Sequence, residues 1–194
     1  EQRLRSQAQE QVQSARPDER AVVQAVQNQL NEAIQALKTS RLGKGALYKL
    51  PWYMIIGPPG SGKSTALQES GLNFPYVSEG RKGVRGVGGT RNCDWWFTDE
   101  GILLDTAGRY TTELDDKEEW IGFLDLLKKA RKRKPVNGAM VAVSVTDLLA
   151  ASDEELEAHA KNIRGRIDEL TNHLEIVFPV YLLFTKCDLL QGFV

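Results

Sequence analysis

The sequence predicts an α/β protein in which a mostly parallel, doubly wound β-sheet is covered by helices on both faces. Continuous apolar runs, typical of strands buried on both faces, occur at Trp52–Ile56, Ala139–Val145 and Val177–Thr185. Helical patterns separate these strands at Lys63–Glu69, Glu118–Lys134 and Asp153–His173. A glycine-rich loop directly follows the first strand. Strands that alternate with helices in this way indicate a doubly wound sheet.

One strand at the edge of this sheet is expected to run antiparallel. Strand-like runs at Cys93–Thr98 and Ile102–Asp105 are joined by Asp99-Glu100-Gly101, which suits a tight hairpin turn. Between the first helix and this hairpin lies a glycine-rich, basic segment at 79–90. It has no periodicity, which predicts a mobile loop.

Residues 1–45 are predicted to form a helical segment in front of the α/β domain, which spans 46–194. An apolar stripe at helical spacing runs through Val22, Val26, Leu30, Ile34 and Leu37. The polar face mixes both charge signs, so packing on the following domain or on a partner helix is favoured over membrane binding. The chain starts on Glu1 and stops within an element at Val194, which suggests a piece of a longer protein, truncated at its C-terminus.

Composition sets bounds on the function. With 41% hydrophobic and 26% charged residues among 194, the chain is typical of a soluble globular protein. Its net charge of −1 argues against a general nucleic-acid binder, which would be strongly basic. The two cysteines cannot form a disulfide framework, which favours a reducing compartment. No apolar run reaches the length of about 18 residues that a membrane span requires.

The loop after the first strand matches GxxxxGKS, the pattern of a phosphate-binding loop in nucleoside triphosphate enzymes. Glycines allow backbone conformations in which successive N–H groups point at phosphate oxygens, and the N-terminus of the following helix favours the same negative charge. Lys63 would reach the β- and γ-phosphates, and Ser64 would offer a hydroxyl to Mg²⁺. The predicted nucleotide-binding residues of this loop are Gly57, Pro58, Pro59, Gly60, Ser61, Gly62, Lys63, Ser64 and Thr65.

Two further stretches predict the magnesium site. Asp105 ends a buried apolar strand, and ligands of doubly wound sheets sit beyond the carboxyl ends of the strands. Asp105 is therefore predicted to hold Mg²⁺ directly or through water, while Gly108 would offer its N–H to the γ-phosphate. Thr90 in the loop 79–90 is predicted to join Ser64 and Asp105 as a magnesium ligand. That loop would order with a triphosphate and relax with a diphosphate.

Thr185-Lys186-Cys187-Asp188 follows the last strand and resembles the base-recognition motif of GTPases. The Asp188 carboxylate would accept hydrogen bonds from the guanine N1 and 2-amino groups, which adenine cannot offer. The Lys186 stem would pack along the base and ribose, with Thr185 beside it. With adenine in the site, the Asp188 carboxylate would lack these hydrogen-bond donors, and a missing partner of this kind discriminates strongly between ligands. GTP is therefore favoured over ATP. The alternative is that Asp188 only caps a helix.

Arg109 stands where Ras-like enzymes have the Gln that orients the attacking water. An arginine cannot accept a hydrogen bond from that water, although it can stabilise charge that develops on the phosphoryl oxygens. The predicted catalytic residues are Lys63, Thr90 and Arg109, with Arg85 and Arg91 as other candidates for an arginine acting in cis. We expect slow intrinsic hydrolysis, or hydrolysis that requires a partner.

Three runs, GPPGSGKST at 57–65, GVGGTRNCDWWFTDEGILLDTAGRY at 86–110 and LFTKCD at 183–188, resemble the cytoplasmic domain of the type VI secretion inner-membrane protein, the IcmF/TssM family. The middle run is the most specific, because its Cys-Asp-Trp-Trp-Phe is not a general GTPase feature. The resemblance implies a bacterial inner-membrane protein whose anchors lie outside this chain, with this domain on the cytoplasmic side. It also implies the other membrane-complex subunits as partners, with the baseplate as a further candidate, and a switching or energising role for the nucleotide.

Three alternatives stay open at this point. The domain would be an ATPase if Asp188 does not reach the base. It would be a structural docking module if it binds nucleotide weakly or not at all. A small-molecule kinase is disfavoured because no arginine-rich lid is visible. The residues Cys93, Cys187, His159 and His173 are not clustered as metal ligands are, so structural roles are expected for them.

Overall fold

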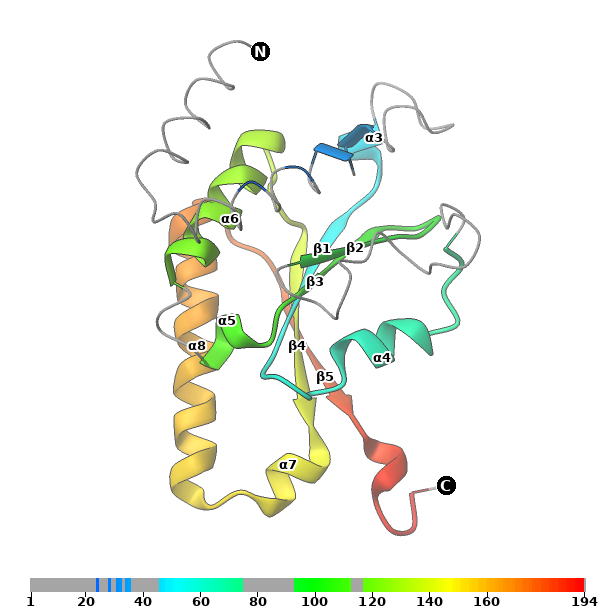
Figure 1. Ribbon diagram of the computed structural model, residues 1–194, viewed down its shortest axis with the longest axis vertical. Helices are drawn as coiled ribbons and strands as arrows, with labels where there is room; N and C mark the ends of the chain where they lie inside the picture. The colour runs from blue at the N-terminus through cyan, green and yellow to red at the C-terminus, as the bar shows by residue number, and fades with distance from the viewer. Residues whose placement is uncertain are drawn as a thin grey trace.

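The computed structural model describes residues 24, 28, 31, 32, 34, 35, 46–74, 93–112 and 117–193. In this part of the chain, five strands form one sheet in the order β2-β3-β1-β4-β5 (Figure 1). The strands are β1 (Trp52–Ile56), β2 (Cys93–Phe97), β3 (Ile102–Thr106), β4 (Gly138–Ser144) and β5 (Val180–Thr185). All neighbours pair in parallel except β2, which lies antiparallel to β3 at the edge. The predicted mostly parallel α/β sheet with an antiparallel edge strand is confirmed.

Helices lie on both sides of this sheet. They are α3 (Ala46–Lys49), α4 (Lys63–Gln68), α5 (Arg109–Thr112), α6 (Lys117–Ala130), α7 (Val145–Ala150) and α8 (Asp153–Leu174). The helices α6 and α8 pack side by side on one face, while α4 lies on the other (Figure 1). The helix α8 begins with a capping box, in which Ser152 and Glu155 satisfy each other's backbone N–H groups.

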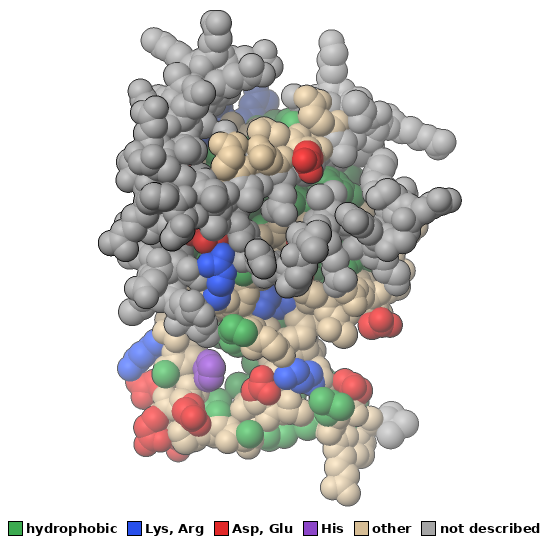
Figure 2. Space-filling model, in the orientation of Figure 1, with side chains coloured by type: hydrophobic (Ala, Val, Ile, Leu, Met, Phe, Trp, Pro, Cys, Tyr) green, Lys and Arg blue, Asp and Glu red, His purple; other side chains and the backbone are tan. Residues whose placement is uncertain are grey.

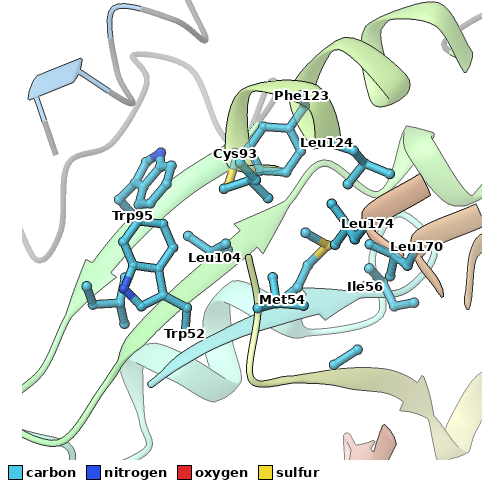
Figure 3. Close-up of a cluster of buried hydrophobic side chains, with 14 of the residues drawn as sticks. Trp52, Met54, Ile56, Cys93, Trp95, Leu104, Phe123, Leu124, Leu170 and Leu174 are labelled. Carbon is cyan, nitrogen blue, oxygen red and sulfur yellow. The ribbon is translucent and has the colours of Figure 1, made fainter. Parts of the chain in front are cut away.

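The larger part of the core lies between the sheet and the pair α6 and α8. Alternate residues of β1, including Trp52 and Met54, point to this face because successive side chains of a strand point to opposite faces. The Trp52 and Trp95 rings meet edge to face, with their centroids 5.3 Å apart. Leu170 of α8 reaches the same cluster from the helical side (Figure 3). This packing explains why β1 to β4 have nearly continuous apolar sequences.

The opposite face has a smaller core. There Ile55, Trp96 and Leu103 of the sheet are buried with Leu67 of α4, and Tyr53, Phe74 and Met140 are partly buried around them. The short helix α4 is the described element that covers this face (Figure 1). Because α4 directly follows the glycine-rich loop, the packing of Leu67 on the sheet also holds the end of the loop against the sheet.

Two predicted elements differ from the structure. The helix expected at Glu118–Lys134 ends at Ala130, and the next side chain, Arg131, is buried with its guanidinium 4.7 Å from the centre of the Trp52 ring. The strand expected to be buried at Val177–Thr185 begins at Val180 and is largely exposed, so its predicted burial is wrong. The periodicity of the sequence could not show this, since burial depends on what covers the strand.

The predicted N-terminal helical segment lies mostly outside the described residues. Of its apolar stripe, Ile34 is described, and it is partly buried against the main core cluster, as the packing prediction expects. The other stripe residues lie outside the described part. No described helix is long and apolar enough to span a membrane.

Candidate functional site

The candidate site lies at the carboxyl edge of the parallel strands. The chain leaves β1 at Ile56, β3 at Thr106, β4 at Ser144 and β5 at Thr185, all at this same edge because these strands are parallel. The hydroxyl of Thr106 donates to the Ile55 carbonyl at 2.7 Å and joins the ends of β3 and β1. The sheet therefore brings the glycine-rich loop 57–64, Asp105 and the Thr185 segment together, as the sequence predicts.

The loop depends on glycine at particular positions. Gly60 and Gly62 have φ angles of 73° and 80°, in the left-handed region that other residues rarely adopt. At Gly57, with a φ of 154°, an added Cβ would lie 2.6 Å from the Ala142 carbonyl oxygen of β4. The loop backbone can therefore lie directly against the sheet edge and still turn into α4.

Lys63 is the buried cation of the site. It is 7% exposed, and its ammonium donates hydrogen bonds to the carbonyls of Gly57 and Pro58 at 2.8 and 3.1 Å. Burial lowers the pKa of Lys63, and the nearby Asp105 carboxylate opposes this shift without cancelling it. An anion bound within the loop would relieve that cost of burial, so the lysine is chemically suited to a phosphate.

Ser64 and Asp105 meet directly. The hydroxyl of Ser64 donates to the Oδ2 atom of Asp105 at 2.5 Å, although 41 residues separate them in the sequence. Asp105 is fully buried at the end of β3, and Ser64 is half-buried in the first turn of α4. A hydroxyl and a carboxylate are hard oxygen donors of the kind that Mg²⁺ takes from proteins. These two side chains therefore fit the predicted metal.

Gly108 lies against the glycine-rich loop. A Cβ added there would be 2.5 Å from both the Cα and the N of Pro59, and 2.9 Å from the carbonyl carbon of Pro58. The Thr111 hydroxyl and N–H both donate to the Gly108 carbonyl, which fixes the turn into α5. The turn after β3 and the glycine-rich loop therefore form one packed unit.

Thr185 connects the end of β5 to the loop. Its hydroxyl donates to the Ser61 carbonyl at 2.6 Å, and Gly62 packs on the same side chain. The Ser61 hydroxyl is fully buried and has no hydrogen-bond partner among the described residues. The third predicted stretch thus adjoins the first through Thr185.

The residues after Thr185 contact α7. The Lys186 ammonium lies 3.4 Å from the Oδ1 atom of Asp147 in the first turn of α7. Burial alone would raise the pKa of Asp147, but hydrogen bonds from Ser144 and Lys186 outweigh it and hold the pKa below its usual value. Asp188 is exposed in a short 3-10 helix, η2 (Cys187–Leu189), where its carboxylate is accessible to a ligand.

Arg109, the first residue of α5, forms an ion pair with Glu119 of α6. Its guanidinium donates to Glu119 at 2.7 Å and lies 5.0 Å from the centre of the Tyr110 ring. The Tyr110 hydroxyl donates to the same carboxylate oxygen, and burial together with the Glu119 charge raises the pKa of Tyr110. The predicted catalytic arginine is therefore engaged with Glu119 in this conformation.

Some predicted residues cannot be placed, and some neighbours were not predicted. Thr90, Arg85 and Arg91 lie outside the described residues, as does the loop 79–90. Thr65 is exposed on α4, and Pro59 and Gly60 are exposed at the tip of the loop. Sequence reasoning missed Asp94, Glu119, Ser144 and Asp147. Of these, Asp94 is buried and pairs in register with Asp105, which alternation along the hairpin could have revealed.

The buried carboxylates of Asp94 and Asp105 affect the pKa of Cys93. Burial raises the pKa of the Cys93 thiol, and the charges of Asp105 and Asp94 raise it further. Cys93 is therefore a protonated, buried core residue, as its predicted structural role requires. The described residues contain no cluster of three His, Cys, Asp or Glu side chains that could hold a metal ion. A cation here would instead depend on Ser64 and Asp105 together with oxygens from a ligand.

The fold and the site together define an α/β protein that gathers an ammonium, a hydroxyl and a carboxylate beside a glycine-rich loop at the edge of its sheet. The family model of the IcmF-related N-terminal domain matches residues 113–194. The type VI secretion system component TssM1 of Pseudomonas aeruginosa is 56% identical over 176 residues, which cover 87% of this chain. The chain belongs to the IcmF/TssM family.

The chain spans only a small part of its relative. The aligned residues amount to 16% of the length of TssM1. The comparison therefore establishes kinship for nearly the whole of this chain, while most of the relative's length has no counterpart in it.

Proposed function

We propose that this domain binds a nucleoside triphosphate with Mg²⁺, and prefers GTP, in a GTPase-like phosphate-loop site. The observation that carries the proposal is the contact between Ser64 and Asp105, 2.5 Å long, beside the buried ammonium of Lys63. Lys63 and Ser64 come from the glycine-rich loop after β1 and Asp105 from the end of β3, and the fold brings these two motifs to one place. Only a ligand that carries both anionic oxygens and a divalent cation would use all three.

Each of these residues has a distinct role in the proposal. The loop 57–62 would surround the phosphates with its backbone N–H groups, since its glycines accept the backbone angles that this requires. Lys63 would exchange its carbonyl partners for phosphate oxygens. Ser64 and Asp105 would hold Mg²⁺, which supplies charge neutralisation to the phosphates when it is bound. Thr90 remains a predicted further ligand.

Base preference rests on Asp188. A carboxylate there would accept hydrogen bonds from guanine N1 and the 2-amino group. Exchanging it for an amide in Asp188→Asn would leave the amide N–H facing that amino group. Xanthine carries a carbonyl at the same position, so the variant should lose affinity for GTP and gain affinity for xanthosine triphosphate. ATP binding should change little if the carboxylate recognises guanine.

Calorimetry with GTP, ATP and xanthosine triphosphate in the presence of Mg²⁺ tests this proposal. Asp168→Asn is a suitable control, because it also exchanges an exposed carboxylate for an amide, on α8. Tighter binding of ATP than of GTP by the unaltered protein, unchanged in Asp188→Asn, would replace GTP with ATP in the proposal. No binding of any triphosphate, with Lys63→Ala indistinguishable, would reject the site.

We expect slow hydrolysis. Arg109 is engaged by Glu119, so the residue that replaces the water-orienting Gln is held by an acid on α6. Multiple-turnover phosphate release from the isolated domain measures the rate. Fast turnover that survives Arg109→Ala would contradict the expectation.

The cellular setting of this function follows from the family. As a member of the IcmF/TssM family, the chain would act in a type VI secretion system, as the name of its relative TssM1 states for that protein. We propose that it switches or energises the membrane complex from the cytoplasmic side of the inner membrane, anchored by segments outside this chain. Its partners would be other membrane-complex subunits, with the baseplate as a further candidate. Co-purification of those subunits with wild type and with Lys63→Ala tests for a nucleotide-dependent contact.

One observation favours a second candidate function. The loop is closed on itself, because Lys63 donates to the Gly57 and Pro58 carbonyls and Gly108 touches Pro59. A docking module with vestigial nucleotide binding would keep this closed loop permanently. The calorimetric experiment separates the two functions, since only the first one predicts saturable, magnesium-dependent binding.

A further inference from the structure

The strand β5 exposes a row of large apolar side chains. Leu182, Phe184 and Tyr181 are 63%, 54% and 50% exposed, although the strand has the continuous apolar sequence of one that is covered on both faces. Nearby, Leu149 of α7 and Leu189 of η2 are also exposed. Figure 2 shows hydrophobic side chains along the lower part of the molecule, over α7. We call Val180–Thr185 with these two leucines the β5 surface.

Both faces of β5 are uncovered. Leu182 and Phe184 pair with Val141 and Val143, so they point to the same face as the main core. Tyr181 pairs with Met140 and points to the opposite face, where its ring meets Tyr53 with the centroids 6.3 Å apart. The helix α8 therefore stops short of covering β5 on one face, and α4 stops short on the other.

The outer edge of β5 also has hydrogen-bonding capacity. The strand is last in the order β2-β3-β1-β4-β5, so in the described part it pairs on one side only. The Ala139 N–H donates to the Pro179 carbonyl at 3.1 Å. The backbone groups of Pro179 and of every second residue after it therefore point towards β4. By the alternation of a parallel ladder, the N–H groups of Leu182 and Phe184 point outward. An exposed, apolar edge of this kind is a template for another strand.

We propose that a segment of the same polypeptide, outside residues 1–194, covers the β5 surface by adding a strand to the edge and helices to both faces. The TssM1 relative supports this source, since 84% of its length lies outside the aligned 16%. A second copy of this chain fits less well. Pairing two β5 edges across a two-fold axis would satisfy the edge, but it would leave Leu182, Phe184 and Tyr181 uncovered on both faces. A connected strand and helices would cover the edge and the faces together.

This docking would reach the candidate site. Thr185 ends β5, and its hydroxyl holds the Ser61 carbonyl of the glycine-rich loop. Strand addition would therefore fix the end of β5 and, through Thr185, the loop. The inference itself does not depend on nucleotide binding, because it rests on the exposure and edge of β5 alone.

Hydrogen exchange in the full-length protein tests the proposal. The amides of Leu182 and Phe184 should exchange at least about 100-fold more slowly in the full-length protein than in residues 1–194, because they would gain ladder hydrogen bonds. The protection should be the same at low and high protein concentration. Exchange that stays equally fast in both proteins would overturn the proposal. Protection of these amides that appears only when the protein forms a dimer would also overturn the proposal, because it would assign the surface to a second copy. Protection that appears only when another subunit is added would overturn it as well.

A matched pair of substitutions gives an independent readout. Leu182→Glu should lower the thermal midpoint of the full-length protein, because its side chain would be buried under the added segment. Leu72→Glu places the same charge at an exposed leucine and should have little effect. Leu72 lies two residues before Phe74, which packs on Trp96 of β2 at the opposite edge of the sheet from β5. In residues 1–194 both substitutions should be tolerated alike. Equal tolerance in the full-length protein would contradict the proposal even if the amides were protected by some other means.

Discussion

Replacing Gly108 with alanine should break the contact between the turn after β3 and the glycine-rich loop. The new Cβ would lie 2.5 Å from the Pro59 Cα and N atoms. Carbon atoms ordinarily approach to about 3.5–4.0 Å, so the overlap is roughly 1 Å. The atoms in the way belong to the backbone of a Pro-Pro pair, which cannot rotate aside as a flexible side chain could.

The expected loss of stability follows from this overlap. Overpacking typically costs about 1–3 kcal/mol, and the rigid neighbours place Gly108→Ala near the upper end. For a chain of this size, about 3 kcal/mol corresponds to a fall of roughly 6–12 °C in the thermal midpoint. Thermal and urea unfolding, followed by circular dichroism, measure both quantities. Nucleotide affinity should fall as well, since the loop and the turn form one packed unit.

Gly165→Ala is the matched control, and its expected effect has the opposite sign. Gly165 lies within α8, and an added Cβ there would meet no atom within 4 Å. Alanine should therefore stabilise the helix by about 0.5–1 kcal/mol. If Gly108→Ala were as stable as wild type while Gly165→Ala behaved as expected, the turn would not lie against Pro59 and the geometry of the site would be wrong.

Three further changes probe the site and the fold. Burial lowers the pKa of Lys63 and a bound phosphate would raise it, so triphosphate binding should take up protons at alkaline pH and weaken as pH rises towards the usual lysine pKa. Calorimetry in buffers of different ionisation enthalpy measures this proton uptake, and Lys63→Ala should abolish it. Equal proton uptake by wild type and Lys63→Ala would refute the assignment to Lys63. Arg131→Ala should lower the free energy of unfolding by about 2–4 kcal/mol, because this buried side chain packs on Trp52 and bonds to Asn137. Ser152→Ala should cost about 1 kcal/mol through loss of the capping box of α8. Urea unfolding checks both, and unchanged midpoints would contradict the burial or the cap.

Local patterns in the sequence predict most of the sheet. The strand Trp52–Ile56 is found with the predicted bounds, and the hairpin at Asp99-Glu100-Gly101 is found with its neighbours antiparallel. These elements are short and apolar and are bounded by glycine or turn residues, so local signals suffice. The order of motifs along the chain also places Asp105 and Thr185 beside the loop, because parallel strands share one carboxyl edge.

What the sequence could not predict depends on contacts between distant residues. Nothing near Arg131 in the sequence shows that its side chain packs on Trp52, or that α6 ends at Ala130. Glu119 binds Arg109 across the gap between α5 and α6, so a motif position alone could not show which partner the arginine has. The helix α7, which carries Asp147, is not predicted from the sequence, because its six residues are too few to show a period.

The magnesium dependence of triphosphate binding tests the central claim most directly. Wild type and Asp105→Asn would be titrated with a non-hydrolysable GTP analogue, once with Mg²⁺ and once with a chelator. The contact between Ser64 and Asp105 predicts that Mg²⁺ tightens binding to wild type by at least about tenfold, which is 1.4 kcal/mol, and that the variant loses most of this gain. Binding that is equally tight with and without Mg²⁺ in wild type, or no binding at all, would contradict the proposed site.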